Sequence, residues 1–107
     1  MFKRNITLFL FLALVLVLTG AAFAHTPLCA CYENGDGTVT CKGGFADGSS
    51  AAGVQMRVED NNGTVLIEGK MDEDSEFTFD KPSGTYKIVF EAEEGHRIEI
   101  YGKEVVE

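Results

Sequence analysis

TYKIVFEA, residues 85–92, is the stretch of sequence that decides the fold. Tyr86, Ile88 and Phe90 fall on one face of an extended chain, and mainly polar residues alternate with them. Such alternation is typical of a strand that is buried on one side. Working outward from this stretch, the same two-residue period marks further segments, at residues 52–59, 64–68, 76–79 and 97–101. The sequence therefore predicts a series of half-buried β-strands.

Turn sequences separate these segments about every ten residues. They are rich in glycine, asparagine and aspartate, and they occupy residues 34–37, 47–50, 60–63, 72–75 and 81–84. No window of helical length keeps an apolar stripe at the helical period. The pattern predicts an all-β fold, a small antiparallel β-sandwich of about six or seven strands, prealbumin-like or immunoglobulin-like in kind.

The middle of the chain, about residues 43–100, resembles the transthyretin-like or carboxypeptidase-regulatory-like β-sandwich domains. The matching motifs are GFADG at 44–48, AGVQMRV at 52–58, DED at 72–74 with FTF at 77–79, and PSGTYKIV at 82–89. One departure is Ser75-Glu76, where such domains often have a glycine before the first phenylalanine. The resemblance implies a fold and little about function. The residues agree with it, because Phe77, Phe79 and Tyr86 are the expected core anchors.

The first 24 residues have the features of a secretory signal peptide. Lys3 and Arg4 form a basic start, an almost unbroken apolar run extends over residues 6–18, and Ala22-Phe23-Ala24 supplies an A-x-A cleavage site. The run is shorter than the roughly 20 residues that an uncleaved membrane anchor needs. We expect cleavage to leave His25 as the new amino terminus and residues 25–107 as a single β-sandwich domain without membrane insertion. The expected location is periplasmic or secreted.

The charge of the mature chain restricts its partners. Removal of Lys3 and Arg4 leaves seven of the nine basic residues against all seventeen acidic ones, a net charge of about −10. This balance argues against nucleic acid and anionic membrane surfaces. A membrane transporter or another envelope protein is the kind of partner expected.

Three cysteines, Cys29, Cys31 and Cys41, lie near the mature amino terminus. In an oxidising compartment two of them are expected to pair, which would staple a hairpin around the turn at residues 34–37. A three-residue loop with Gly37 in the left-handed conformation would place Cys31 opposite Cys41. A slip in register would favour Cys29 instead, and the sequence alone leaves both pairings open.

His25 is the position of greatest chemical interest. A free amino-terminal histidine offers its α-amine and imidazole as a chelating pair for nickel, cobalt or copper, ions that favour nitrogen and sulfur donors. If Cys31 pairs with Cys41, Cys29 is the candidate sulfur ligand, and His96 is a further candidate. His25 after the export signal, and Gly95-His96 after an acidic turn, also resemble small periplasmic proteins that accompany bacterial nickel or cobalt uptake systems. That resemblance implies a metal-binding transport accessory.

The sequence also allows functions other than metal uptake. A metal-free protein-interaction module at the cell envelope is the main alternative, and a carbohydrate-binding module would need an exposed aromatic platform. The acidic residues Asp72, Glu73, Asp74 and Glu76 could hold calcium, but a solvated turn explains them better. The sequence contains no G-x-S-x-G, H-E-x-x-H or phosphate-binding loop, so an enzyme is not expected.

Overall fold

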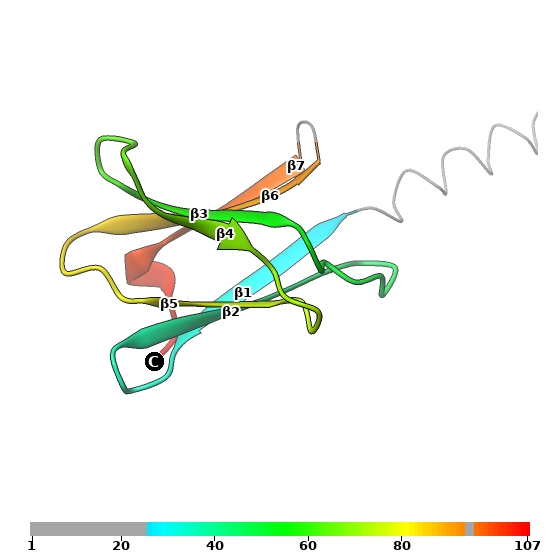
Figure 1. The fold of residues 1–107 in the computed structure, drawn as a ribbon, viewed down its shortest axis with the longest axis horizontal. Helices are drawn as coiled ribbons and strands as arrows, with labels where there is room; N and C mark the ends of the chain where they lie inside the picture. The colour runs from blue at the N-terminus through cyan, green and yellow to red at the C-terminus, as the bar shows by residue number, and fades with distance from the viewer. Residues whose placement is uncertain (1–25, 94–95) are drawn as a thin grey trace, which may run out of the picture.

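The computed structural model describes residues 26–93 and 96–107. Its elements are β1 (Pro27–Glu33), β2 (Thr38–Phe45), β3 (Gln55–Asp60), β4 (Val65–Lys70), β5 (Glu76–Asp80), β6 (Tyr86–Glu93), β7 (His96–Tyr101) and the short 3-10 helix η1 (Gly102–Glu104). The strands form two antiparallel sheets, one in the order β1-β2-β5 and the other in the order β4-β3-β6-β7 (Figure 1). The predicted antiparallel β-sandwich of six or seven strands is confirmed. The predicted signal peptide, residues 1–24, lies outside the described residues.

The core lies between the inner faces of the two sheets. Its largest fully buried side chains are those of Phe90, Met56, Ile88, Val39, Val58 and Cys41, with β6 at the centre of the four-stranded sheet. Of the expected aromatic anchors, Tyr86 and Phe79 are 4% and 5% exposed, and Phe77 is partly buried against the core. The rings of Phe79 and Tyr86 meet edge to face with centroids 6.2 Å apart, an arrangement that adds to their apolar burial.

The strand predicted to start at residue 52 begins later, at Gln55. The preceding residues form a turn, in which the N–H of Val54 donates to the carbonyl of Ala51 and Gly53 has φ +82°. Met71 exchanges backbone hydrogen bonds with this turn, accepting from Gly53 and donating to Val54. The apolar alternation extended beyond the strand because Val54, in this turn, packs against the core.

The outer face of β6 contains a buried residue among charged ones. Val89 lies on the face predicted to be polar, yet none of it is exposed. Its cross-strand neighbours are Arg57 and Glu99, and Glu59 accepts a 2.7 Å hydrogen bond from Arg57 Nε. Lys87 Nζ lies 3.6 Å from carboxylate oxygens of both Glu59 and Glu99. The aliphatic parts of these long side chains cover Val89 while their charged ends pair with one another.

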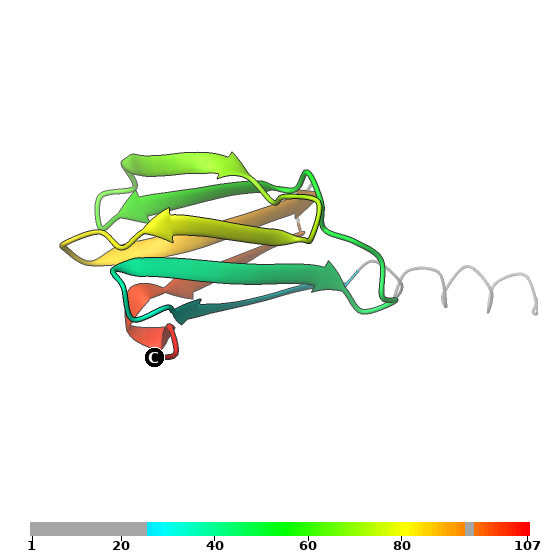
Figure 2. The same ribbon diagram turned by 60° about the horizontal axis from the view of Figure 1, so that its bottom comes forward.

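Strands β1 and β7, which are edge strands of different sheets, contact each other at one side of the sandwich. They run in the same direction, so both begin at the same end of the molecule (Figures 1 and 2). At the opposite end, Tyr32 of β1 forms a parallel bridge with Val106, and the N–H of Glu33 donates to the Val106 carbonyl at 2.7 Å. These contacts attach β1 to the segment that follows β7 and η1.

No helix among the described residues is both long enough and apolar enough to span a membrane.

Candidate functional site

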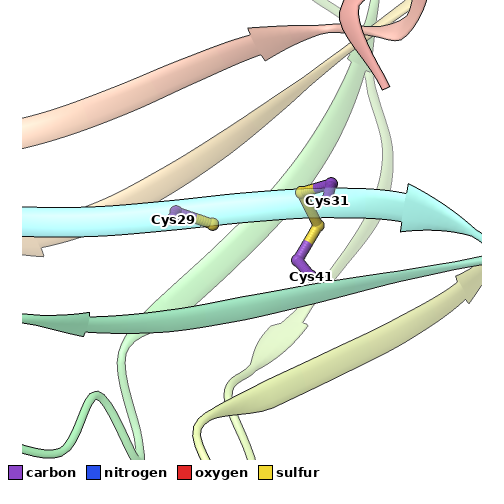
Figure 3. Close-up of side chains that lie close together, drawn as sticks. All are labelled: Cys29, Cys31 and Cys41. Carbon is purple, nitrogen blue, oxygen red and sulfur yellow. A yellow bond between two sulfur atoms is a disulfide. The ribbon is translucent and has the colours of Figure 1, made fainter. Parts of the chain in front are cut away.

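The three cysteines form a sulfur cluster at the β1–β2 hairpin. Cys29 and Cys31 share one face of β1 because they are two residues apart in an extended strand, and Cys41 lies on β2 (Figure 3). Cys31 and Cys41 are joined by a disulfide that spans ten residues of sequence. The three Sγ atoms all lie within 4.8 Å of one another. We call this group, Cys29, Cys31 and Cys41, the sulfur cluster.

The register of the hairpin explains why Cys31, rather than Cys29, is cross-linked to Cys41. The N–H of Asn34 donates to the Thr38 carbonyl across a three-residue loop, and Gly37 in that loop has φ +92°. A positive φ is accessible to glycine without steric cost, so this loop fixes the pairing of the two strands. Cys31 is then directly opposite Cys41 with a Cα–Cα distance of 4.0 Å. The predicted pairing of Cys31 with Cys41 is confirmed.

Cys29 is directly opposite Gly43. A Cβ atom on Gly43 would lie 2.7 Å from Cε2 of Phe90 and 3.1 Å from the sulfur of Met71, so those two side chains occupy the space beside this glycine. The Cys29 thiol is free, partly buried and packed against the core. Burial disfavours the charged thiolate and raises the pKa of Cys29 to about 11. At neutral pH Cys29 is therefore a neutral thiol and a weak nucleophile.

His96 is the first residue of β7, and its side chain is exposed. It shares one face of the strand with Ile98 and Ile100, which pack against the core. Since β1 and β7 are in contact and begin at the same end of the sandwich, Cys29 and His96 lie on neighbouring edge strands near that end. His25, the other predicted ligand, lies outside the described residues.

From the sequence, Cys29 was expected to join His25, and its proximity to the disulfide was not predicted. The signal was present in the two-residue spacing of Cys29 and Cys31, because alternate residues of a strand project to one face. With Cys31 opposite Cys41, that spacing places the sulfur of Cys29 beside the disulfide. The nearby Met71 follows β4 in sequence, and no local pattern predicts that it reaches Gly43.

The acidic segment that follows β4 forms a turn stabilised by its own first residue. One carboxylate oxygen of Asp72 accepts hydrogen bonds from the backbone N–H groups of Asp74 and Glu76, at 2.8 and 3.0 Å. The N–H of Asp72 in turn donates to the Glu76 carbonyl. The segment is therefore a turn capped by Asp72. The solvated turn expected from the sequence is of this general kind.

No family model, curated protein or solved structure matches this chain. The resemblances drawn from the sequence therefore stay predictions.

Proposed function

We propose that this chain is an exported, non-catalytic β-sandwich protein of the periplasm or the extracellular medium that binds a transition metal ion, nickel, cobalt or copper. Its role would be that of an accessory to metal uptake, with a membrane transporter or another envelope protein as its partner. The disulfide between Cys31 and Cys41 is compatible with an oxidising compartment.

The observation that carries this proposal is the common starting end of β1 and β7. His96 begins β7 at that end, and Cys29 lies near the start of β1, two residues after Pro27. His25 precedes β1 directly in the sequence, separated from it by Thr26 alone. A cleaved amino terminus at His25 would add an amine and an imidazole to the imidazole of His96 and the sulfur of Cys29. Nitrogen and sulfur donors of this kind suit nickel, cobalt and copper.

The ligands must release protons to bind the ion. Burial raises the pKa of the Cys29 thiol to about 11, so protons compete with the metal for this ligand. We therefore expect the affinity to fall as the pH is lowered from 8 to 6. The net charge of about −10 on the mature chain favours association with cations in general.

The test is calorimetric titration of the oxidised mature protein, which must begin at His25, with nickel, cobalt and copper(II). A version with one additional N-terminal alanine removes the six-membered chelate formed by the amine and imidazole of one residue, and it should bind at least about tenfold more weakly. His96→Ala should also weaken binding, whereas Arg97→Ala, at the next position of β7 and also exposed, should not. Equal affinity in the native and extended proteins would contradict the proposal.

A metal-free protein-interaction module is the second candidate, and the edge strand β4 favours it. In the described sheet β4 pairs only with β3, and its Val65 and Leu66 are 45% and 47% exposed. An exposed edge strand can add a strand from another protein. If none of the three ions binds the mature protein, this second function takes precedence.

A further inference from the structure

The sulfur cluster is chemically distinct from the proposed histidine site, because two of its three sulfurs are bound to each other. While the Cys31–Cys41 bond is intact, Cys29 is the one thiol of the cluster. Exchange within the chain would create a bond from Cys29 to Cys41, which occupy diagonal positions of the β1–β2 pair. Diagonal positions are about 7–8 Å apart between Cα atoms, beyond the span that a disulfide bridges without backbone movement. Disulfide exchange with Cys29 is therefore disfavoured in the folded protein.

We propose that reduction of the Cys31–Cys41 disulfide converts the sulfur cluster into a three-thiolate binding site for copper(I). The reductant is a dithiol, such as the active site of a disulfide reductase. It gives two electrons and two protons to Cys31 and Cys41 and becomes a disulfide itself. Copper(I) then forms bonds to the three sulfurs and the thiol protons are released to solvent, with copper remaining in the +1 state throughout.

The geometry suits such an ion. Metal–sulfur bonds of about 2.3 Å place three ligand sulfurs about 3.7–4.0 Å apart, for tetrahedral or trigonal angles respectively. The three Sγ atoms already lie within 4.8 Å of one another, so side-chain rotations would suffice once the disulfide opens. Cys29 and Cys31 come from one strand and Cys41 from its partner, so the hairpin holds the set together without a contribution from distant loops.

The donor chemistry favours copper(I) over zinc. Thiolates and thioethers are the soft ligands that copper(I) prefers, and three sulfurs satisfy its coordination. Zinc in a structural site takes four ligands, whereas this group supplies three. The Met71 thioether beside Gly43, opposite Cys29, adds a further soft donor nearby. Three thiolates and one copper(I) leave a negative charge, which the partial exposure of Cys29 on an edge strand allows water to stabilise.

This site goes beyond the proposed function and does not depend on it. It requires neither His25 nor His96, and it operates in the reduced protein, whereas the divalent-metal site belongs to the oxidised one. The two proposals share Cys29 alone. His96→Ala should therefore leave copper(I) binding unchanged while it weakens the binding of nickel.

The test measures copper(I) affinity of the mature chain under anaerobic conditions, by competition with a chromophoric copper(I) chelator, before and after reduction with a phosphine. Reduction should raise the affinity at least tenfold, because two ligands become available. The matched control is the double variant Cys29→Ala/Ala30→Cys. It keeps three cysteines but moves the third sulfur to the exposed outer face of β1. This variant should bind at least tenfold more weakly than the reduced native sequence.

A second measurement separates a folded site from thiols that bind copper in an unfolded chain. A ligand that binds the folded state preferentially raises the melting temperature, and a ligand that induces folding restores the near-ultraviolet circular dichroism. Copper(I) should do one of these for the reduced native sequence and neither for the double variant. Equal affinity, or equal stabilisation by copper(I), in the two proteins would overturn the proposal.

Discussion

Reduction of the Cys31–Cys41 disulfide should lower the free energy of unfolding by about 2.7 kcal/mol. The bridge spans ten residues of sequence. In the chain-entropy model a loop of that size restricts the unfolded chain by about 9 cal/mol/K, which gives this free energy at 25 °C. For a domain of roughly 80 residues the loss corresponds to a fall in melting temperature of about 10–20 °C. The effect arises in the unfolded state, since reduction removes no atoms from the core.

The assay is urea unfolding of the mature protein with and without a phosphine reductant. The same pair of curves for Cys29→Ala serves as the control, because that variant keeps the disulfide but has no third thiol to exchange with it. Reduction should also increase the dependence of the unfolding free energy on urea, because an uncrosslinked unfolded chain exposes more surface. A loss below about 1 kcal/mol with an unchanged urea dependence would refute the entropic reasoning.

Three further predictions concern the sulfur cluster and its surroundings. Gly43→Ala should destabilise the fold by about 1–3 kcal/mol, because its Cβ would lie 2.7 Å from Phe90 and 3.0 Å from Met71; Gly44→Ala, whose nearest neighbour would be 3.8 Å away, should have little effect in the same denaturation assay. Cys29 should react with iodoacetamide at pH 8 about 100-fold more slowly in the folded than in the unfolded protein, because its pKa is raised from 9.0 to about 11. The folded protein holds the Cys29 proton more tightly than the unfolded chain, so stability should be highest below pH 9.0 and should decline as the pH rises from 9.0 toward 11. Cys29→Ala removes this titrating group and should make that decline shallower. Equal alkylation rates in the two states would contradict this account of Cys29.

Much of the fold could be predicted because its signals are local. The alternation in residues 85–92 and the repeated turn sequences are properties of neighbouring residues, and they identified the strands. The pairing of Cys31 with Cys41 was one of the two that the sequence left open, and the short loop with a glycine at residue 37 determines the register that selects it. What local patterns did not give was the order of strands in each sheet, which depends on contacts between distant segments.

The burial of Val89 illustrates this limit. Its alternation placed it correctly on the outer face, but the side chains that cover it come from β3 and β7 as well as from β6. The same limit applies to the site. The two-residue period of a strand could have predicted that Cys29 lies beside the disulfide. The approach of Met71 and Phe90 to Gly43, by contrast, arises only when the two sheets pack together.

The bridge between Tyr32 and Val106 bears on when the molecule can fold during synthesis. These residues are 74 positions apart in the sequence, so the ribosome must add nearly the whole domain after β1 before the bridge can form. Contacts of such long sequence separation slow folding, because a large loop must be closed before they form. Until Val106 has been translated, β1 has its partner in β2 but lacks this attachment to the C-terminal segment. The nascent chain therefore completes its sandwich only once Val106 has left the ribosome, and until then the unattached edge of β1 can be bound by a chaperone.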